Sequence, residues 1–351
     1  MDAVEYVFIF YIYIFVLFLT NLQKTQTYLM ETNGNLKGVS LLMSYIADGK
    51  SSGPAITWPN GARIAVMVTF DYDAEFLRIS RAKTKGTKIG FTDFSRGQYG
   101  PHEGLRRCLD MLDTMNIKST FFVPGIVAET YRDTVEEIHR RGHEIACHGY
   151  MHESDPNLSR EEMCEILDRS EAILAEITGR KPVGHRGPES VIHPFTPQLL
   201  AERGYLYSSS MKDCDWAYLW EQDDKTLPLV ELPNDITMDD FTYYYFTFSD
   251  PAVRCMYPNR EVFGNWKQEF DGLALEGNKI FILKLHPQMI GRASRIGMVG
   301  ELISYMKAHG AWIATCEEVA RYVLEQNQNG NQTQNLSTNL NNRTEENGGI
   351  Q

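Results

Sequence analysis

The chain has 351 residues, of which 43% are hydrophobic, so it is long enough to bury one large core or two modest ones. Its formal net charge is −12, from 34 Lys and Arg against 46 Asp and Glu, which disfavours nucleic acid and anionic membrane surfaces as partners. The six cysteines are scattered, without a CxxC pair, so we expect a reducing compartment and a cytoplasmic location.

Residues 1–29 are dominated by an apolar and aromatic run that is short for a membrane span. Two acidic residues precede the run and no small-residue cleavage site follows it, which disagrees with a secretory signal. The segment is either an anchor formed by residues 4–22 or extra sequence that the fold does not need, and we expect the second. Residues 30–60 are interpreted as an irregular lead-in to the domain.

The folded domain is predicted over residues 61–326 and begins with a buried strand. Residues 63–70 are a short, apolar, β-branched run, preceded by the turn signal Asn60-Gly61. Residues 76–101 show no clear period and are predicted to form a long loop, of the kind that is often functional or mobile in compact domains.

Strands and helices alternate after this loop. Further strands are predicted at 119–123, 144–147, 182–186, 205–211, 229–232, 279–285 and 311–315. Helices are predicted at 102–115, 130–141, 159–179, 196–203, 261–275, 298–309 and 317–325. The alternation predicts an α/β fold with a parallel sheet, closed into a distorted (β/α) barrel of seven or eight units. An open doubly wound sheet is the alternative, but no Gly-rich phosphate turn follows the first strand.

Two local signals refine this plan. Ser159 and Glu162 have the spacing of a capping box at the start of the helix predicted at 159–179. Residues 327–351 are rich in Asn and Gln and almost devoid of apolar side chains, so we expect a disordered tail that cannot bury a core.

Polar side chains suited to metal binding and acid–base chemistry follow several predicted strands. They are Asp71, Asp73, His148, His152, Arg186 and His286. The carboxyl ends of parallel barrel strands share one face, so we expect these residues to lie together. Side chains two apart on an extended chain point the same way, and two carboxylates held that close are costly unless a cation joins them.

The pair His148 and His152 is a weak metal signal alone, because surface helices carry such pairs without a metal. Placed at a strand end beside a carboxylate, the pair predicts a His₂Asp ligand set that leaves coordination open for water. That is the pattern of a catalytic zinc or a similar divalent metal.

With these residues in place, the chain resembles the polysaccharide deacetylase family, also called NodB-homology or carbohydrate esterase family 4, over roughly Ile64–Tyr322. The family motif TFDDG is similar to residues 69–73, which read TFDYD. The motif H-[ST]-x-x-H is similar to residues 148–152, R-x-P to residues 186–188, and a Leu-x-His strand end to residues 283–286. Four motifs in order, each at a predicted strand end, make the resemblance specific.

The motifs depart from the family pattern in two places. Tyr72 separates the two aspartates, and Gly149 replaces Ser or Thr. Together with SRGQYG at residues 95–100 and ELPND at residues 231–235, this variant looks like a branch near bacterial peptidoglycan deacetylase-like proteins. That branch also includes hydrolases of cyclic imides and of ureides such as allantoin. The resemblance therefore implies hydrolysis of a C–N bond without fixing the substrate.

The resemblance implies a role for each of the six residues. Three of them would hold a divalent metal, with zinc the expected ion: Asp73, His148 and His152. The metal would polarise the amide carbonyl and activate water. Asp71 would act as general base, Arg186 would hold Asp71 ionised and oriented, and His286 would protonate the leaving nitrogen.

The expected partner is a saccharide or another small molecule, and four residues are candidates to contact it: Tyr150, Asp213, Asp215 and Trp216. Tyr243–Tyr245 would either stack on a sugar or pack in the core. The leading hypothesis is a deacetylase of N-acetylated amino sugars, and the second is an amidohydrolase of cyclic imides or ureides. A non-catalytic carbohydrate-binding barrel is the third, although such a copy should have lost a ligand or the base.

Overall fold

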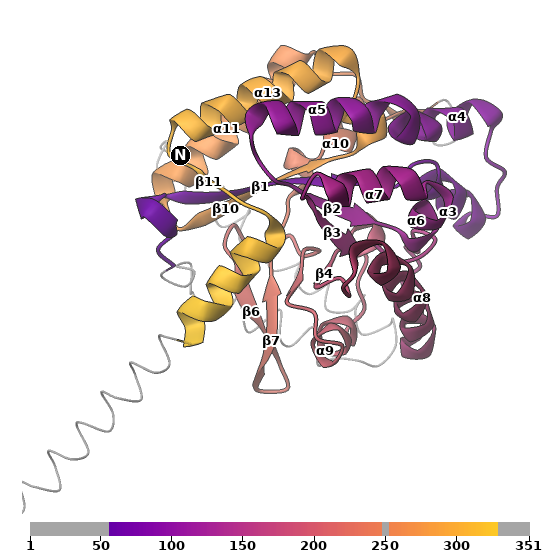
Figure 1. Ribbon diagram of the computed structural model, residues 1–351, viewed down its shortest axis with the longest axis horizontal. Helices are drawn as coiled ribbons and strands as arrows, with labels where there is room; N and C mark the ends of the chain where they lie inside the picture. The colour runs from indigo at the N-terminus through magenta and orange to yellow at the C-terminus, as the bar shows by residue number, and fades with distance from the viewer. Residues whose placement is uncertain (1–55, 248–252, 329–351) are drawn as a thin grey trace, which may run out of the picture. The chain divides into compact units, whose positions relative to one another are not determined.

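The computed structural model describes residues 56–247 and 253–328 (Figure 1). The apolar segment 1–29, nearly all of the predicted lead-in and almost all of the predicted tail lie outside the described residues. Within the described ranges, no helix combines the length and the apolar character that a bilayer crossing requires.

One curled sheet organises the described chain. Its parallel strands are β1 (Ile64–Asp71), β2 (Thr120–Val123), β3 (Glu144–Cys147), β4 (Gly184–His185), β5 (Tyr207–Ser208), β7 (Lys225–Glu231), β10 (Lys279–Leu285) and β11 (Trp312–Ile313). The edge strand β6 (Tyr218–Gln222) runs antiparallel to β7. The pair β8 (Phe246–Thr247) and β9 (Val253–Arg254) forms a separate two-stranded sheet.

The strand order is β10-β1-β2-β3-β4-β5-β7-β6, with β11 beside β1. On one edge of β1, the whole of β10 pairs in parallel, from Ile64 opposite Lys279 to Phe70 opposite Leu285. On the other edge, β11 pairs near the start of β1 and β2 pairs near its end. In the described residues no ladder joins the end strands β6 and β10, so the sheet is a curled, incomplete barrel. The prediction of a distorted (β/α) barrel is confirmed.

Helices cover the sheet. The longer ones are α3 (Phe76–Thr84), α4 (Phe91–Tyr99), α5 (Leu105–Met115), α7 (Arg132–Arg140), α8 (Arg160–Thr178), α9 (Thr196–Glu202), α11 (Asn259–Glu276), α13 (Ala293–Ala308) and a final helix at 316–328. The short ones are η1 (Pro59–Gly61), η2 (Gly100–Gly104), α6 (Gly125–Thr130), η3 (Pro188–Ser190), η4 (Ile236–Met238), α10 (Asp240–Tyr244) and α12 (Pro287–Ile290). Figure 1 shows α5 beside α13, with α11 next to α13 on the same side of the sheet.

The prediction of a loop over residues 76–101 is wrong, because most of this segment forms α3 and α4. Neither helix has a side-chain N-cap, so the sequence carries no start signal. Tertiary contacts hold them instead: Arg78 of α3 pairs with Asp93 of α4 at 3.0 Å, and Ser80 donates to the His152 carbonyl at 2.6 Å. The capping box at Ser159 is confirmed at the start of α8.

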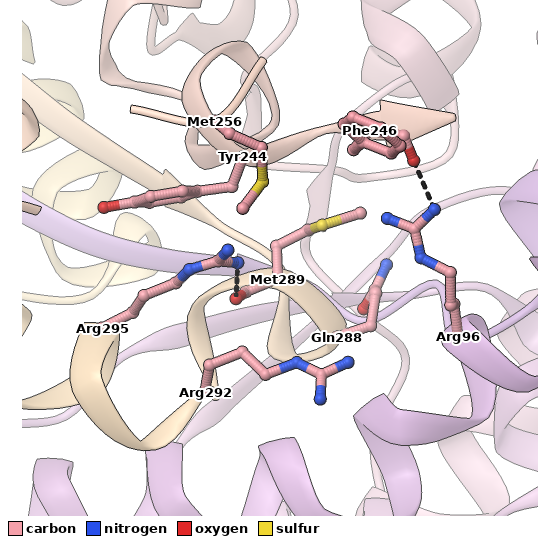
Figure 2. A pocket seen from close by; sticks show the side chains of 8 residues that line it. All are labelled: Arg96, Tyr244, Phe246, Met256, Gln288, Met289, Arg292 and Arg295. Carbon is pink, nitrogen blue, oxygen red and sulfur yellow. Dashed lines mark hydrogen bonds between the residues drawn. The ribbon is translucent and has the colours of Figure 1, made fainter. Parts of the chain in front are cut away.

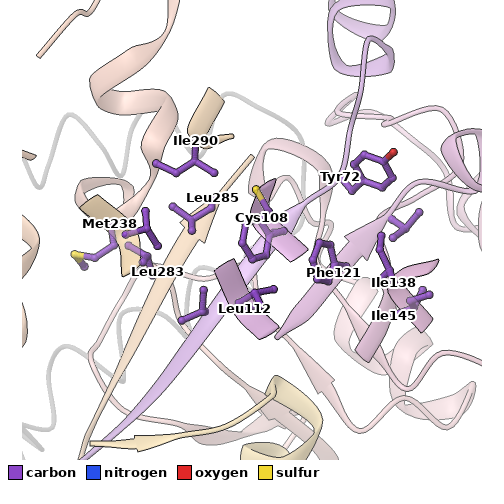
Figure 3. Close-up of a cluster of buried hydrophobic side chains, with 14 of the residues drawn as sticks. Tyr72, Cys108, Leu112, Phe121, Ile138, Ile145, Met238, Leu283, Leu285 and Ile290 are labelled. Atoms are coloured by element: carbon purple, nitrogen blue, oxygen red, sulfur yellow. The ribbon is translucent and has the colours of Figure 1, made fainter. Parts of the chain in front are cut away.

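Two hydrophobic clusters lie on opposite faces of the sheet. The larger one packs the sheet against helices such as α5, α8 and α13, and Figure 3 shows part of it, including Phe121, Leu283 and Leu285. The smaller cluster, on the other face, includes residues of the helix at 316–328. Side chains alternate between the two faces along each strand.

This alternation places the functional residues. In β1, Ala65 and Met67 belong to the smaller cluster. Thr69 and Asp71 follow at the same spacing of two residues, so they lie on the same face of the sheet. In β10 the same rule leads from Ile280 and Ile282 to Lys284 and His286. The sheet face that buries the smaller cluster therefore becomes polar at the carboxyl ends of its strands, where we expected the site.

Candidate active site

Three of the predicted residues meet as a potential metal-binding group. The ligand atoms of Asp73, His148 and His152 all lie within 4.8 Å of one another. Asp73 Oδ1 is 3.5 Å from His148 Nε2 and 3.8 Å from His152 Nε2. Ligand atoms about 2.1 Å from a tetrahedral zinc lie about 3.4 Å apart, so these spacings are close to those that a small divalent ion imposes.

Unsatisfied polar atoms show that the residues present fit a cation. Both carboxylate oxygens of Asp73 and Nε2 of His148 are buried without a hydrogen-bond partner among the described residues. Such orphaned atoms are rare, because each one costs its full desolvation penalty. Burial raises the pKa of Asp73 to about 7, although His286 nearby lowers it. A divalent ion would satisfy all three atoms at once.

The two histidines are held in the form that binds a metal. His148 Nδ1 donates to the Arg186 carbonyl at 2.7 Å, which leaves the Nε2 lone pair free for an ion. Burial lowers the pKa of His148 well below its ordinary value and that of His152 to about 4. Both imidazoles are therefore neutral near pH 7, as metal ligation requires.

A tight turn carries His152 back to the centre. Gly149 and His152 both have positive φ angles, 70° and 60°, so the chain reverses between the two histidines. The Glu153 carboxylate accepts from the amides of Tyr150 and Met151 at 2.9 and 2.8 Å, which fixes the turn. A β-carbon on Gly149 would lie 2.8 Å from a Glu153 carboxylate oxygen, so a residue with a side chain would crowd this turn.

Asp71 lies beside this group and is paired with two cations. Arg186 Nη1 donates to Asp71 Oδ1 at 2.7 Å, and Lys284 Nζ is 3.5 Å from Asp71 Oδ2. Burial alone would raise the pKa of Asp71, but Arg186 and Lys284 outweigh it and hold the pKa well below its usual range. Asp71 is therefore an ionised carboxylate, able to accept a proton at neutral pH.

His286 faces both aspartates from the end of β10. Its Nε2 is 3.8 Å from Asp71 Oδ2 and 3.7 Å from Asp73 Oδ2, while Nδ1 donates to Asp240 Oδ1 at 2.7 Å. Burial opposes a charge on His286, but Asp240 and Asp239 outweigh it and raise the pKa to about 9. The ring is therefore protonated near pH 7 and directs an N–H into the centre.

Three residues of this centre were missed from the sequence: Asp239, Asp240 and Lys284. Lys284 Nζ lies 3.1 Å from Asp239 Oδ2, so the lysine joins Asp239 to Asp71. A lysine inside the apolar run KIFILKL is the signal that could have found it, because charged residues are rarely buried unless paired. The two aspartates follow a short 3₁₀-helix and carry no comparable signal.

None of the four candidate substrate contacts hydrogen-bonds to a residue of this centre among the described residues. Asp215 accepts from the amide of Ile280, and Trp216 lies under Lys279, so both sit at the beginning of β10, about 20 Å along the strand from His286. Asp213 contacts the hydroxyl of Tyr218. The Tyr150 hydroxyl donates to Glu129 of α6, and its ring stacks under Arg169 of α8, in the helix layer.

The centre is enclosed. Its five chemical groups are between 0% and 3% exposed: Asp71, Asp73, His148, His152 and His286. Arg81 of α3 pairs with Glu189 of η3 at 2.6 Å, and the Tyr245 ring packs on Arg81. The Phe241 ring lies edge-on to His286, with ring centroids 4.2 Å apart. Of the tyrosine run, Tyr243 and Tyr244 are buried in the packing.

Comparisons with known proteins agree with this geometry. The family model described as "Polysaccharide deacetylase" matches residues 93–208. The peptidoglycan deacetylase-like protein FGM2 of Gibberella zeae is 29% identical over 300 residues, covering 75% of this chain and 87% of the relative.

Solved structures extend the match over most of the fold. A putative polysaccharide deacetylase from Mycobacterium smegmatis is 33% identical, with a TM-score of 0.73 over 79% of this chain and 96% of that protein. The Puue allantoinase shares the fold, at 24% identity and a TM-score of 0.68 over 78% of this chain and 95% of that one. The chain belongs to the polysaccharide deacetylase family of hydrolases, which cleave the C–N amide bonds of acetylated sugars.

Proposed function

We propose that this protein is a divalent-metal-dependent deacetylase that removes the acetyl group from N-acetylated amino sugars. The observation that carries the proposal is the buried set Asp73, His148 and His152, in which both Asp73 oxygens and His148 Nε2 lack hydrogen-bond partners among the described residues. We expect zinc, because two neutral imidazoles and one carboxylate are its usual catalytic ligands. The name of the FGM2 relative supports a substrate of the peptidoglycan type.

The chain's own groups supply the proton transfers. When bound, the metal would provide Lewis acidity toward the amide carbonyl and a water molecule. Asp71 Oδ2 would accept a proton from the attacking water, since Arg186 and Lys284 keep Asp71 ionised. As the C–N bond breaks, His286 Nε2 would give its proton to the leaving nitrogen, with Asp240 stabilising the charged ring. The products are acetate and the free amine.

The enclosed centre supports a second substrate class, a cyclic imide or ureide. A polymer bound in mid-chain needs an open groove, whereas a small ring needs a pocket that excludes water. The metal-binding side chains are at most 1% exposed, and the paired Arg81 and Glu189 lie close enough to His152 to affect its pKa. If the N-acetyl sugar is the substrate, we therefore infer a terminal unit or a short oligomer.

One preparation tests both reactions. Zinc-loaded protein would be incubated with N-acetylglucosamine oligomers, measuring acetate, and with a cyclic imide, measuring ring opening. Asp73→Asn is the control for any metal-independent background. Acetate release that is lost in Asp73→Asn supports the deacetylase. Ring opening without acetate release would replace it with the amidohydrolase, and neither reaction at any metal loading would refute both.

A further inference from the structure

A cavity of about 380 Å³, separate from the metal-binding group, lies between α10, α12 and α4, and its lining is cationic (Figure 2). Three arginines contribute to the wall, Arg96, Arg292 and Arg295, and none of the eight lining residues is acidic. The whole chain carries a net charge of −12, so this cavity is a positively charged site on an acidic protein. The volume is within the range of small-molecule sites.

Neighbouring carboxylates neutralise these arginines only in part, with Asp240 attracting Arg295 from beyond ion-pair distance. Arg96 lies 3.6 Å from Asp93, but Arg78 pairs with the same carboxylate at 3.0 Å. Arg292 and Arg295 have no ion pair within the described ranges. Isolated surface arginines of this kind are common, but three around one concave space repel one another unless an anion joins them.

Aromatic rings and a carbonyl hold the guanidinium groups in place. The guanidinium carbon of Arg292 is 3.5 Å from the centre of the Tyr99 ring, and that of Arg295 is 3.9 Å from the Tyr244 ring. Arg295 Nη1 also donates to the Met289 carbonyl at 2.7 Å. Stacking occupies the faces of a guanidinium and leaves N–H groups at its edges for an oxyanion.

A buried amide points to a missing ligand independently of the charges. Gln288 is 5% exposed, and its side-chain oxygen has no hydrogen-bond partner in the described part of the chain. Figure 2 shows this amide facing the same space as Arg96 and Arg292. A half-turn about the last side-chain bond exchanges the two ends of the amide, so Gln288 can present its NH₂ group to an anion. Either way, a buried amide without a partner is costly unless something binds it.

From this geometry we propose that the cavity binds an oxyanion, a carboxylate or a phosphate, next to the catalytic centre. Two of the lining residues follow residues of the catalytic centre closely in the chain. Gln288 is two residues after His286, and Tyr244, the last residue of α10, is about 6 Å along the helix axis from Asp240, its first residue. The amides of Met289 and Ile290 donate to the His286 carbonyl, so α12 couples the cavity to the proton donor. Bidentate arginine contacts favour oxyanions over other ligands.

Calorimetry on the full chain tests the site without turnover. Inorganic phosphate and succinate are the probes, and one molecule should bind per chain. Arg292→Gln, at an exposed position, should weaken binding at least tenfold, the loss of about one charge-assisted contact, and Arg292→Lys should recover part of it. Arg106→Gln on α5, an arginine 60% exposed and outside the cavity, should bind as the wild type does. Thermal unfolding of each variant checks that it is folded.

A His148→Ala background separates this cavity from the metal centre. Binding that persists in His148→Ala and is lost in Arg292→Gln supports the proposal, even if the protein proves not to be a deacetylase. Binding lost in His148→Ala but kept in Arg292→Gln would place the anion at the metal instead. That result, or no binding of either probe by the wild type, overturns the proposal.

Two kinetic arms identify the source of the anion, and the first rests on the proposed function. If the anion is part of the substrate, Arg292→Gln should lower kcat/KM for an N-acetylated sugar acid at least tenfold. The kcat/KM for neutral N-acetylglucosamine oligomers should stay unchanged. If the anion is free, added phosphate should change turnover of the neutral oligomers in the wild type and not in Arg292→Gln.

Discussion

At the scale of single residues, the main feature is a carboxylate shared between two cations. Arg186 contacts one oxygen of Asp71 and Lys284 approaches the other. This keeps Asp71 ionised inside a buried site, where an isolated charge would be expensive. It also makes Asp71 a weaker base than a carboxylate with a single partner.

The first prediction separates base from ligand. Asp71→Asn should retain its metal and lose activity by roughly 10²–10⁴-fold, the usual contribution of a general base. His148→Ala should lose metal and activity together, because it removes one of three ligands. Metal analysis of the purified variants, alongside acetate release, makes the comparison. Loss of metal in Asp71→Asn would mean that the two aspartates have exchanged roles.

The second prediction concerns Lys284. Its charge lowers the pKa of Asp71, although burial and Arg186 have the larger effects, so removing it should raise that pKa. Since the base must be ionised, the acidic limb of the kcat/KM profile should move to higher pH in Lys284→Met, with the metal retained. Lys225→Met, at an exposed position on β7, is the control. An unshifted limb would show that Lys284 does not act on Asp71.

At the scale of elements, the sequence predicted what local pattern determines. Strands β1 and β10 are mostly apolar runs; β1 ends in Asp71 and β10 ends just before His286. The sequence therefore indicated both the position of these strands and the reactive residues at their ends. Helices α3 and α4 were not readable, because the ion pair of Arg78 with Asp93 and other contacts between distant segments stabilise them. Lys284 and Asp240 were missed for a related reason: their partners are set by the curl of the sheet.

A buried glutamate links several elements at the other end of the sheet. Glu144 of β3 accepts from Thr120 of β2 at 2.6 Å, from Tyr207 of β5 at 2.7 Å and from the amide of Glu317 at 3.0 Å. Burial raises the pKa of Glu144 to about 7, although these hydrogen bonds lower it. The native state thus holds this proton more tightly than the unfolded chain does.

The third prediction follows from that difference. Between the unfolded pKa of about 4.3 and a folded pKa of about 7, the native state binds more protons, so Glu144 contributes stability at low pH that is lost as pH rises through 7. The unfolding free energy of Glu144→Gln, minus that of the wild type, should therefore rise by up to about 3 kcal/mol from pH 5 to pH 8. Urea unfolding at both pH values measures this difference, with Glu165→Gln, at an exposed position of α8, as the control. An equal difference at both pH values would contradict the assignment.

At the scale of the whole molecule, the described residues already contain a complete two-faced core. Ile56 and Trp58 are buried, and the Trp58 ring packs on Trp312 and Tyr322, so the described chain closes on itself from its first residues. We therefore keep the prediction that residues 1–29 are not needed for folding.

The fourth prediction is that a chain starting at Met30 has the melting temperature and specific activity of the full chain. Its core-forming residues are unchanged, so circular dichroism on heating and acetate release should coincide for the two. Aggregation of the shorter chain, with the longer one stably folded, would show that the apolar segment has a structural role.

The pairing of the first strand with the last ones has a consequence during synthesis. Thr69 of β1 bonds to Leu283 of β10, 214 residues away, and β11 follows later still. At about 5–20 residues per second, a ribosome needs roughly 10–40 s to deliver those partners. During that interval β2 can pair near the end of the nascent run IAVMVTF, but the edge that faces β10 stays unpaired. An uncharged, β-prone segment with an open edge is the type that aggregates. Expression at low temperature or with a chaperone should thus raise the soluble yield more than stabilising the finished fold would.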